Sequence, residues 1–200
     1  MSMSPVDLKC DKCGHQSDSS VVWGQFVYLD GDKELSINRR LSWCHDCENF
    51  VPVEDFEDIN KLISESKSSL EVISNELLKP FRLLFRKTSK VHWKNHIDKF
   101  EQNIKRFEII SNRRGTEKCL HCGSMDIERS EIEYKLHSDE GDNIDFLYTL
   151  FFHPKCGGEY IATRSSIMIN TNPPKRIYNL NGKLLEKCTE KNWADRITFL

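Results

Sequence analysis

The apolar positions at both ends of the chain alternate with polar ones. Examples are "VVWGQFVYL" at 21–29, "IERSEIEYKL" at 127–136, "IDFLYTLFF" at 144–152 and "YIATRSSIMI" at 160–169. A period of two predicts strands with one buried face. The turn "DGD" before "ELSI" at 34–37, and Asn181-Gly182 between two alternating runs, predict hairpins. The acidic stretch "HSDEGDN" is predicted as a turn between strands.

The middle of the chain has a different period. Residues 55–112 contain no glycine and a single proline, Pro80, and their apolar side chains recur every three or four positions. This period predicts helices over 55–78 and 90–112, with a short helical piece over 80–87. The spacing of Trp93, Ile97, Phe100, Ile104 and Phe107 resembles a coiled-coil seam, which a homodimer would use. Pro80 and "KTSK" interrupt the seam, so a helical hairpin is favoured.

Eight cysteines raise the question of chemistry, because six of them form the pairs "CDKC", "CHDC" and "CLHC". The N-terminus shows no signal peptide pattern and no apolar run is long enough to span a membrane, which predicts a cytoplasmic protein. Thiols stay reduced in that compartment, so a disulfide scaffold is disfavoured. A thioredoxin-type redox pair is expected once, at the start of a helix. Metal ligation is the favoured interpretation.

An internal repeat of spacing extends the ligand set. Cys10 and Cys13 are followed by 30 residues and then Cys44 and Cys47; the same interval after Cys119 and Cys122 leads to His153 and Cys156. Thiolate and imidazole both suit tetrahedral zinc. The repeat therefore predicts two structural zinc ions, one held by four cysteines and one by three cysteines and a histidine. The predicted sets are Cys10, Cys13, Cys44 and Cys47, and Cys119, Cys122, His153 and Cys156. His15, His45 and His121 are expected at the surface or beside the ligands.

"CDKCGH…WCHDC" and "CLHCGS…HPKCGG" resemble two zinc ribbons, over residues 8–54 and 116–170. The resemblance implies small β-folds in which two knuckles hold one ion; it implies no particular function. Gly14, Gly123 and Gly157 follow the pairs, where a knuckle turns tightly. The spacing is also similar to rubredoxin, which would imply iron, but "CHDCEN" and the histidine disfavour that reading.

The predicted architecture is α+β. It has an N-terminal zinc ribbon over 1–54, a helical segment over 55–115, and a second ribbon with a C-terminal hairpin and tail over 116–200. Each ribbon is too small to be stable by burial alone, so zinc would supply folding free energy.

Charge and motifs leave two functional hypotheses. No nucleotide-binding, nucleophile or zinc deaminase motif is present, so no catalytic site is predicted. The first hypothesis is a protein-interaction adaptor using exposed edges and aromatics such as Trp23 and Trp43. The alternative is a nucleic-acid-binding regulator, because the segment 79–118 carries twelve basic residues against four acidic ones. Its candidate contacts are Arg82, Arg86, Lys87, Lys90 and Lys94. The formal net charge of -2 favours the adaptor.

Overall fold

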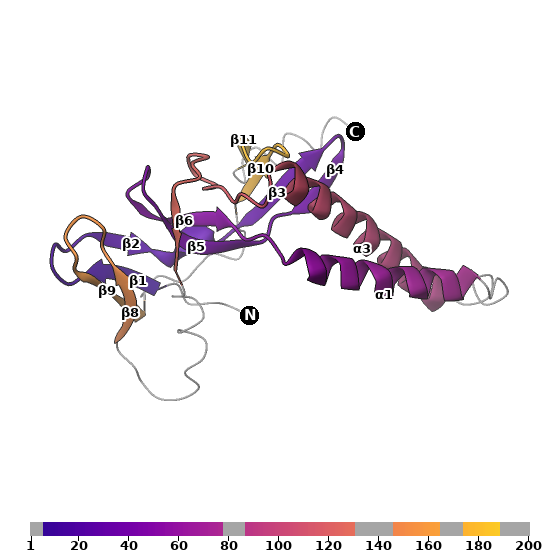
Figure 1. Ribbon diagram of the computed structural model, residues 1–200, viewed down its shortest axis with the longest axis horizontal. Coiled ribbons are helices and arrows are strands. Elements are labelled where there is room, and N and C mark those ends of the chain that lie inside the picture. The colour runs from indigo at the N-terminus through magenta and orange to yellow at the C-terminus, as the bar shows by residue number, and fades with distance from the viewer. Residues whose placement is uncertain (1–5, 78–86, 131–145, 165–173, 189–200) are drawn as a thin grey trace. The chain divides into compact units, whose positions relative to one another are not determined.

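The computed structural model describes residues 6–77, 87–130, 146–164 and 174–188 (Figure 1). The chain divides into two compact units. The strand unit comprises residues 1–55 and 117–200, and the helical unit comprises residues 56–116. Within the described ranges the protein is mixed α+β, as predicted, with two α-helices and three sheets.

The helical unit is built from α1 (Ile59–Leu77) and α3 (Lys87–Asn112), which pack against each other. The ion pairs Glu57–Arg106 and Glu65–Lys99 show that the two helices run antiparallel, because the residue numbers rise along α1 while they fall along α3. Both predicted long helices are present, and most of the predicted piece at 80–87 lies outside the described residues. Neither α1 nor α3 is long and apolar enough to cross a membrane.

The strand unit contains three sheets and a short 3-10 helix, η1 (Ser19–Val22). The first sheet has the order β2 (Gln16–Asp18), β1 (Val6–Cys10), β9 (Glu159–Arg164), β8 (Phe146–Phe152). The second has the order β11 (Leu184–Cys188), β10 (Lys175–Tyr178), β3 (Gln25–Asp30), β4 (Lys33–Ser36). The third has the order β6 (Asn49–Glu54), β5 (Arg39–Cys44), β7 (Ile127–Arg129).

Every described sheet joins a strand that precedes the helical unit in the sequence to a strand that follows it. In the first sheet β1 pairs antiparallel with β9, in the second β3 pairs parallel with β10, and in the third β5 pairs antiparallel with β7. Figure 1 shows the indigo strand β1 beside the orange strands β8 and β9. The segments predicted as two separate ribbons therefore share their sheets and belong to one compact unit.

Several predicted strands differ from the observed ones. The run at 21–29 begins in η1 and forms a strand only from Gln25. The predicted strand at 127–136 is described only as far as 130, and the "HSDEGDN" turn and the end of the 160–169 strand lie outside the described residues. The hairpin at Asn181-Gly182 is confirmed: β10 and β11 pair antiparallel, and Gly182 has a φ of 77°.

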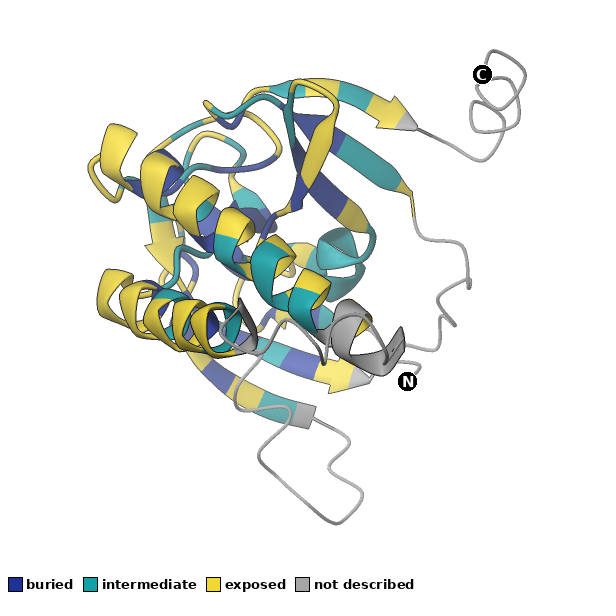
Figure 2. Ribbon diagram, turned by 90° about the vertical axis from the view of Figure 1, so that its right-hand side faces the viewer, coloured by how far each residue is buried: buried dark blue, intermediate teal, exposed yellow. Residues whose placement is uncertain are grey.

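Aromatic side chains form the centre of the strand unit. Trp43, Phe50, Phe151 and Tyr160 pack with ring centroids 4.9–6.1 Å apart. Trp43 is only 1% exposed. The expectation that Trp43 contributes to an exposed docking surface is therefore wrong, because the side chain fills the core between β5 and the first sheet. The colours of Figure 2 show buried residues on the strands and mostly exposed residues on the two helices.

A buried carboxylate joins the two chain segments of the strand unit, close to the points in the sequence where the helical unit begins and ends. The Glu54 side chain is fully buried and accepts hydrogen bonds from the Tyr28 hydroxyl at 2.5 Å and from the Lys118 backbone N–H at 3.0 Å. The Glu54 N–H in turn donates to the Lys118 carbonyl oxygen at 3.0 Å. Arg40 forms ion pairs with Asp55 and Glu117. These contacts hold residues 117 and 118 beside β6.

Candidate metal centres

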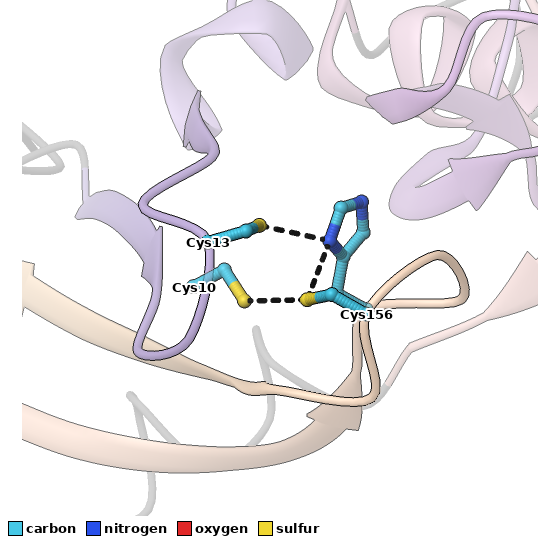
Figure 3. A group of neighbouring side chains, drawn as sticks. Cys10, Cys13 and Cys156 are labelled. Atoms are coloured by element: carbon cyan, nitrogen blue, oxygen red, sulfur yellow. Dashed lines mark hydrogen bonds between the residues drawn. The ribbon is translucent and has the colours of Figure 1, made fainter.

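One group of four ligand side chains, here called the histidine site, consists of Cys10, Cys13, His153 and Cys156. Cys10 ends β1 and Cys13 lies in the following turn, while the other two ligands lie in the turn between β8 and β9. The Cys10 and Cys156 sulfurs are 3.5 Å apart. The Nδ1 atom of His153 lies 3.2 Å from the sulfurs of both Cys13 and Cys156. Figure 3 shows the three labelled cysteines pointing toward one another from these two turns.

The second group, here called the thiolate site, consists of Cys44, Cys47, Cys119 and Cys122. Cys44 ends β5, and Cys47 lies in the turn that leads into β6. The Cys44 and Cys122 sulfurs are 3.6 Å apart, and the Cys47 and Cys119 sulfurs are 3.8 Å apart. Cys44 and Cys119 are fully buried, and Val51 and Val53 pack beside them.

The spacing of the ligand atoms fits a tetrahedral ion in both sites. Sulfurs ~2.3 Å and nitrogens ~2.0 Å from a tetrahedral zinc ion are separated by about 3.8 Å for two sulfurs and about 3.5 Å for sulfur and nitrogen. The observed separations of 3.5–3.8 Å and 3.2 Å lie close to those values. In each site all the ligand atoms lie within 4.8 Å of one another. The two sites could therefore each hold one metal ion.

The eight predicted ligands are thus the residues that come together, but the predicted grouping of four is wrong. The sequence repeat joined the first pair to the second and the third pair to the fourth. The structure joins the first pair, Cys10 and Cys13, to the last pair, and the second pair, Cys44 and Cys47, to the third. The arrangement is nested: the thiolate site lies within the loop of chain that the histidine site closes.

Strand pairing explains the nested arrangement. Cys10 is paired with Tyr160 in the β1–β9 ladder, which brings the first knuckle beside the turn that holds His153. Cys44 is paired with Ile127 in the β5–β7 ladder, and an isolated bridge joins Val53 to Cys119. The repeat in spacing is the same whichever knuckles pair, so it cannot distinguish the two groupings.

The four knuckles share a local conformation. The residue after the second ligand has a positive φ in each: 72° at Gly14, 50° at Glu48, 84° at Gly123 and 66° at Gly157. In the three glycine knuckles this residue donates its N–H to the carbonyl oxygen of the first ligand, at 2.8–3.0 Å. Glycine adopts this conformation without the strain that a Cβ atom introduces. The predicted tight turns are confirmed, and Glu48 shows that the second knuckle forms without glycine.

Backbone amides favour negative charge on some of the sulfurs. Burial opposes ionisation of Cys10, but the N–H groups of Cys13 and Lys12 donate to its sulfur, and the pKa of the thiol lies below its ordinary value. Burial raises the pKa of the Cys119 thiol to about 12, although the N–H groups of Cys122 and His121 donate to that sulfur. A bound cation would offset the cost of ionising such a buried thiol.

The His153 ring lies in an aromatic cage of His15, Trp43 and Tyr160. The His15 ring stacks on it at a centroid distance of 5.1 Å, and Trp43 meets it edge-on at 5.3 Å. The Tyr160 hydroxyl is 2.7 Å from Nδ1 of His15. Burial, together with the nearby His15 and Lys155, lowers the pKa of His153, which favours the neutral imidazole that a metal requires. His15 thus lies beside a ligand, in one of the two positions expected for it.

The structure leaves the predicted nucleic-acid contacts largely undescribed. Lys94 is exposed on α3. Lys87 and Lys90 belong to the same helix, and their side chains lie outside the described residues, as do Arg82 and Arg86 altogether.

Gly158 is a residue of the histidine site that spacing alone did not single out. A Cβ atom on Gly158 would lie 2.7 Å from the Cys10 sulfur and 2.5 Å from Cβ of Lys12. The double glycine in "KCGG" is the sequence signal, since Gly157 provides the turn and Gly158 provides the close approach of the two knuckles.

A methyl group at position 158 is expected to separate the two knuckles of the histidine site. We predict that Gly158→Ala weakens metal binding at this site at least tenfold, which a chelator competition titration would measure. Gly31→Ala is the control, because at a φ of 62° it introduces backbone strain in a turn but no clash, since no atom lies within 4 Å of an added Cβ at Gly31. Equal metal affinity in the two variants would refute the close-approach argument.

Metal binding is expected to survive replacement of the His153 imidazole by a thiolate, but to weaken when a methyl group replaces it. We predict that His153→Cys keeps the full metal content, because a fourth sulfur also suits a tetrahedral ion, whereas His153→Ala lowers the affinity of that site. Metal content after dialysis against a weak chelator is the measurement. If His153→Ala bound metal as tightly as the parent protein, His153 would not be a ligand.

The fold and the two ligand sets together define a mixed α+β protein with two candidate four-ligand metal sites. No family model matches the chain, and no curated protein or solved structure matches it either. The geometry of the sites therefore carries the functional argument.

Proposed function

We propose that the protein is a non-catalytic zinc protein in which two structural ions hold the strand unit together. The observation that carries this proposal is that each site assembles four protein ligands, three or four of them cysteine. Zinc is the ion that such soft, tetrahedral ligand sets favour. A complete set of four ligands leaves no open position for a substrate or an activated water, which is typical of structural zinc rather than catalytic zinc.

We further propose that this rigid unit serves as a protein-interaction adaptor, through the outer side of β8. Leu150 and Phe152 are 65% and 57% exposed, and Tyr148 is half-exposed beside them. Alternate residues of a strand project to the same side. Exposed apolar rows of this kind are typical of surfaces that bind another protein. We therefore expect the partner to be a protein that presents apolar side chains.

The backbone at Leu150 supports a binding role for this row. Leu150 has a φ of 58°, which is unusual for a bulky residue and costs of order 1–3 kcal/mol. The β8–β9 ladder is irregular between Tyr148 and Phe152, and the Leu150 N–H donates to the Glu159 carboxylate at 2.7 Å. The contact with the neighbouring strand maintains this backbone strain, and the apolar side chain stays in solvent. Backbone strain of this kind is typical of functional positions.

The nucleic-acid hypothesis receives less support from the described part of α3. Lys99, Lys105 and Arg106 form ion pairs with Glu65, Glu108 and Glu57 within the helical unit. Part of the basic charge therefore neutralises acidic neighbours, as the net charge of -2 also suggests. Nucleic-acid binding would show a steep salt dependence, because phosphate contacts release counterions.

The adaptor proposal is tested by placing a photo-crosslinking amino acid at position 152 in the zinc-loaded protein. Proteins captured in nuclease-treated extract are identified, purified and titrated back against the parent and the double variant Leu150→Ser Phe152→Ser. We expect saturable binding to the parent, little dependence on salt and at least a tenfold loss in the variant, with two zinc ions retained in both. A matched substitution at Leu185 of β11, which is also exposed, should leave binding unchanged. Equal binding by parent and double variant would refute the role of β8.

A further inference from the structure

The helical unit has two faces of different character. On one face, Glu65 of α1 forms an ion pair with Lys99 of α3 at 2.9 Å, and Glu57, two residues before α1, forms one with Arg106 of α3 at 2.8 Å. Leu62 and Ser69 of α1 and Asn103 of α3 are buried, and we take them to mark the line along which the two packed helices meet. The remaining large apolar side chains of the unit can be placed relative to this line of contact.

Five of these side chains lie on the side opposite the ion pairs. Successive residues of an α-helix are about 100° apart, so Ile63 follows Leu62, and Leu70 follows Ser69, around α1 in the same direction. Ile104 follows Asn103 around α3 by the same angle. When two right-handed helices run antiparallel and face each other, a step of one residue along either chain moves the side chain from the line of contact toward the same side of the helix pair. Glu65, three residues after Leu62, lies about 60° the other way, which agrees with its ion pair. We name this side the apolar hairpin face; its residues are Ile59, Ile63, Leu70, Ile104 and Phe107.

The apolar hairpin face remains partly exposed after the helices have packed. Its side chains are 38–46% exposed, and Ile73, Ile97 and Phe100 on the same side are half-buried. The apolar rows of both helices run lengthwise, as in one layer of a four-helix bundle. A second layer of two helices would cover them.

The charges at the edges of the face indicate what covers it. Continuing the register of the two ion pairs toward the far end of the hairpin places Glu71 of α1 level with Lys94 of α3. Both side chains are exposed, and by the same 100° rule each lies at the outer edge of the apolar hairpin face. A twofold axis parallel to the helices would place α1 over α3 of the second copy at the same level. Glu71 would then face the partner's Lys94, and the contact would occur twice.

We propose that the apolar hairpin face binds a second copy of this chain, forming a four-helix bundle with α1 packed against the partner's α3. The face is self-complementary, since each copy supplies both the apolar rows and one charge of each sign at the matching level. An isologous contact of this kind closes at two copies. The proposal is independent of the adaptor role proposed for β8, which lies in the other unit.

The test is the oligomeric state of the zinc-loaded full chain, measured by sedimentation equilibrium. We expect a species of twice the 23.4 kDa chain mass. Ile63→Gln with Leu70→Gln should weaken association on the order of a hundredfold, because four partly exposed apolar side chains would lose their burial. A monomeric parent at about 100 μM would overturn the proposal and leave the face to another protein. Unchanged association in the variant would overturn it too.

Swapping the charges of Glu71 and Lys94 tests the same contact without removing apolar side chains, and so applies even if the apolar variant loses its helices. Glu71→Lys and Lys94→Glu should each weaken association about tenfold, and the double variant should restore it, because the pair is then reversed but still opposite in sign. Lys61→Glu is the control, since Lys61 is exposed on the ion-pair side of α1. Failure of the double variant to restore association would refute the proposed pairing of α1 with the partner's α3.

Discussion

Removal of zinc with a strong chelator is expected to unfold the strand unit. Structural zinc contributes about 10–16 kcal/mol per site in small zinc domains, which equals or exceeds the 5–15 kcal/mol total stability of a typical domain. Here the described strands are only three to seven residues long, and each site joins a segment that precedes the helical unit in sequence to a segment that follows it. Without the ions, the knuckles that align β1 with β9 and β5 with β7 would lose their fixed positions.

Hydrogen exchange followed by mass spectrometry measures this loss directly. Amides of β1, β5 and β9 should exchange at nearly the unfolded rate after chelation and recover their protection when zinc is added back. Magnesium added in place of zinc is the control, because it prefers oxygen ligands and should restore nothing. Strand amides that stay protected in metal-free protein would show that burial alone holds the sheets together.

Trp43→Ala is expected to produce the second large effect, and to act on both candidate metal sites. Removing a buried tryptophan costs about 3–5 kcal/mol. Trp43 is adjacent in sequence to Cys44 of the thiolate site, while its ring packs on His153 of the histidine site at 5.3 Å. The side chain therefore connects the two sites, and we expect the variant to release metal from the histidine site more readily as well as to unfold at lower denaturant concentration.

Urea unfolding and chelator competition separate the two consequences. Trp43→Phe should retain most of the stability, because an aromatic ring still fills the cage. Trp23→Ala is the matched control, since Trp23 is half-buried and lies at the end of η1, outside the aromatic cluster. A loss below about 1 kcal/mol in Trp43→Ala would contradict the packing described for the core.

The sequence was sufficient to identify the eight candidate ligands because the pattern of each pair is local. Two cysteines with two residues between them and a following residue with positive φ define a knuckle within five residues. His153 was found because it keeps the interval of the other copy. The helices could be predicted equally well, since apolar residues recurring every three to four positions over 59–77 and 87–112 indicate a helix without tertiary information.

The grouping of the ligands could not be predicted in the same way. It depends on which strands pair, and the β1–β9 and β5–β7 ladders join residues more than 80 positions apart in sequence. Nothing in the spacing of Cys10 and Cys13 distinguishes the second knuckle from the fourth. The burial of Trp43 escaped prediction for the same reason, because its neighbours Phe151, His153 and Tyr160 come from the other end of the chain.

The zinc stoichiometry of two double variants, measured by native mass spectrometry in excess zinc, tests the nested arrangement most directly. In Cys13→Ser Cys156→Ser both changes fall in the histidine site, and we predict that one zinc ion remains, held by the thiolate site. In Cys13→Ser Cys47→Ser each site loses one ligand, and we predict a marked loss of both ions. The opposite result, with no zinc in the first variant and one in the second, would contradict the nested arrangement and show that each ion is held by neighbouring pairs along the chain.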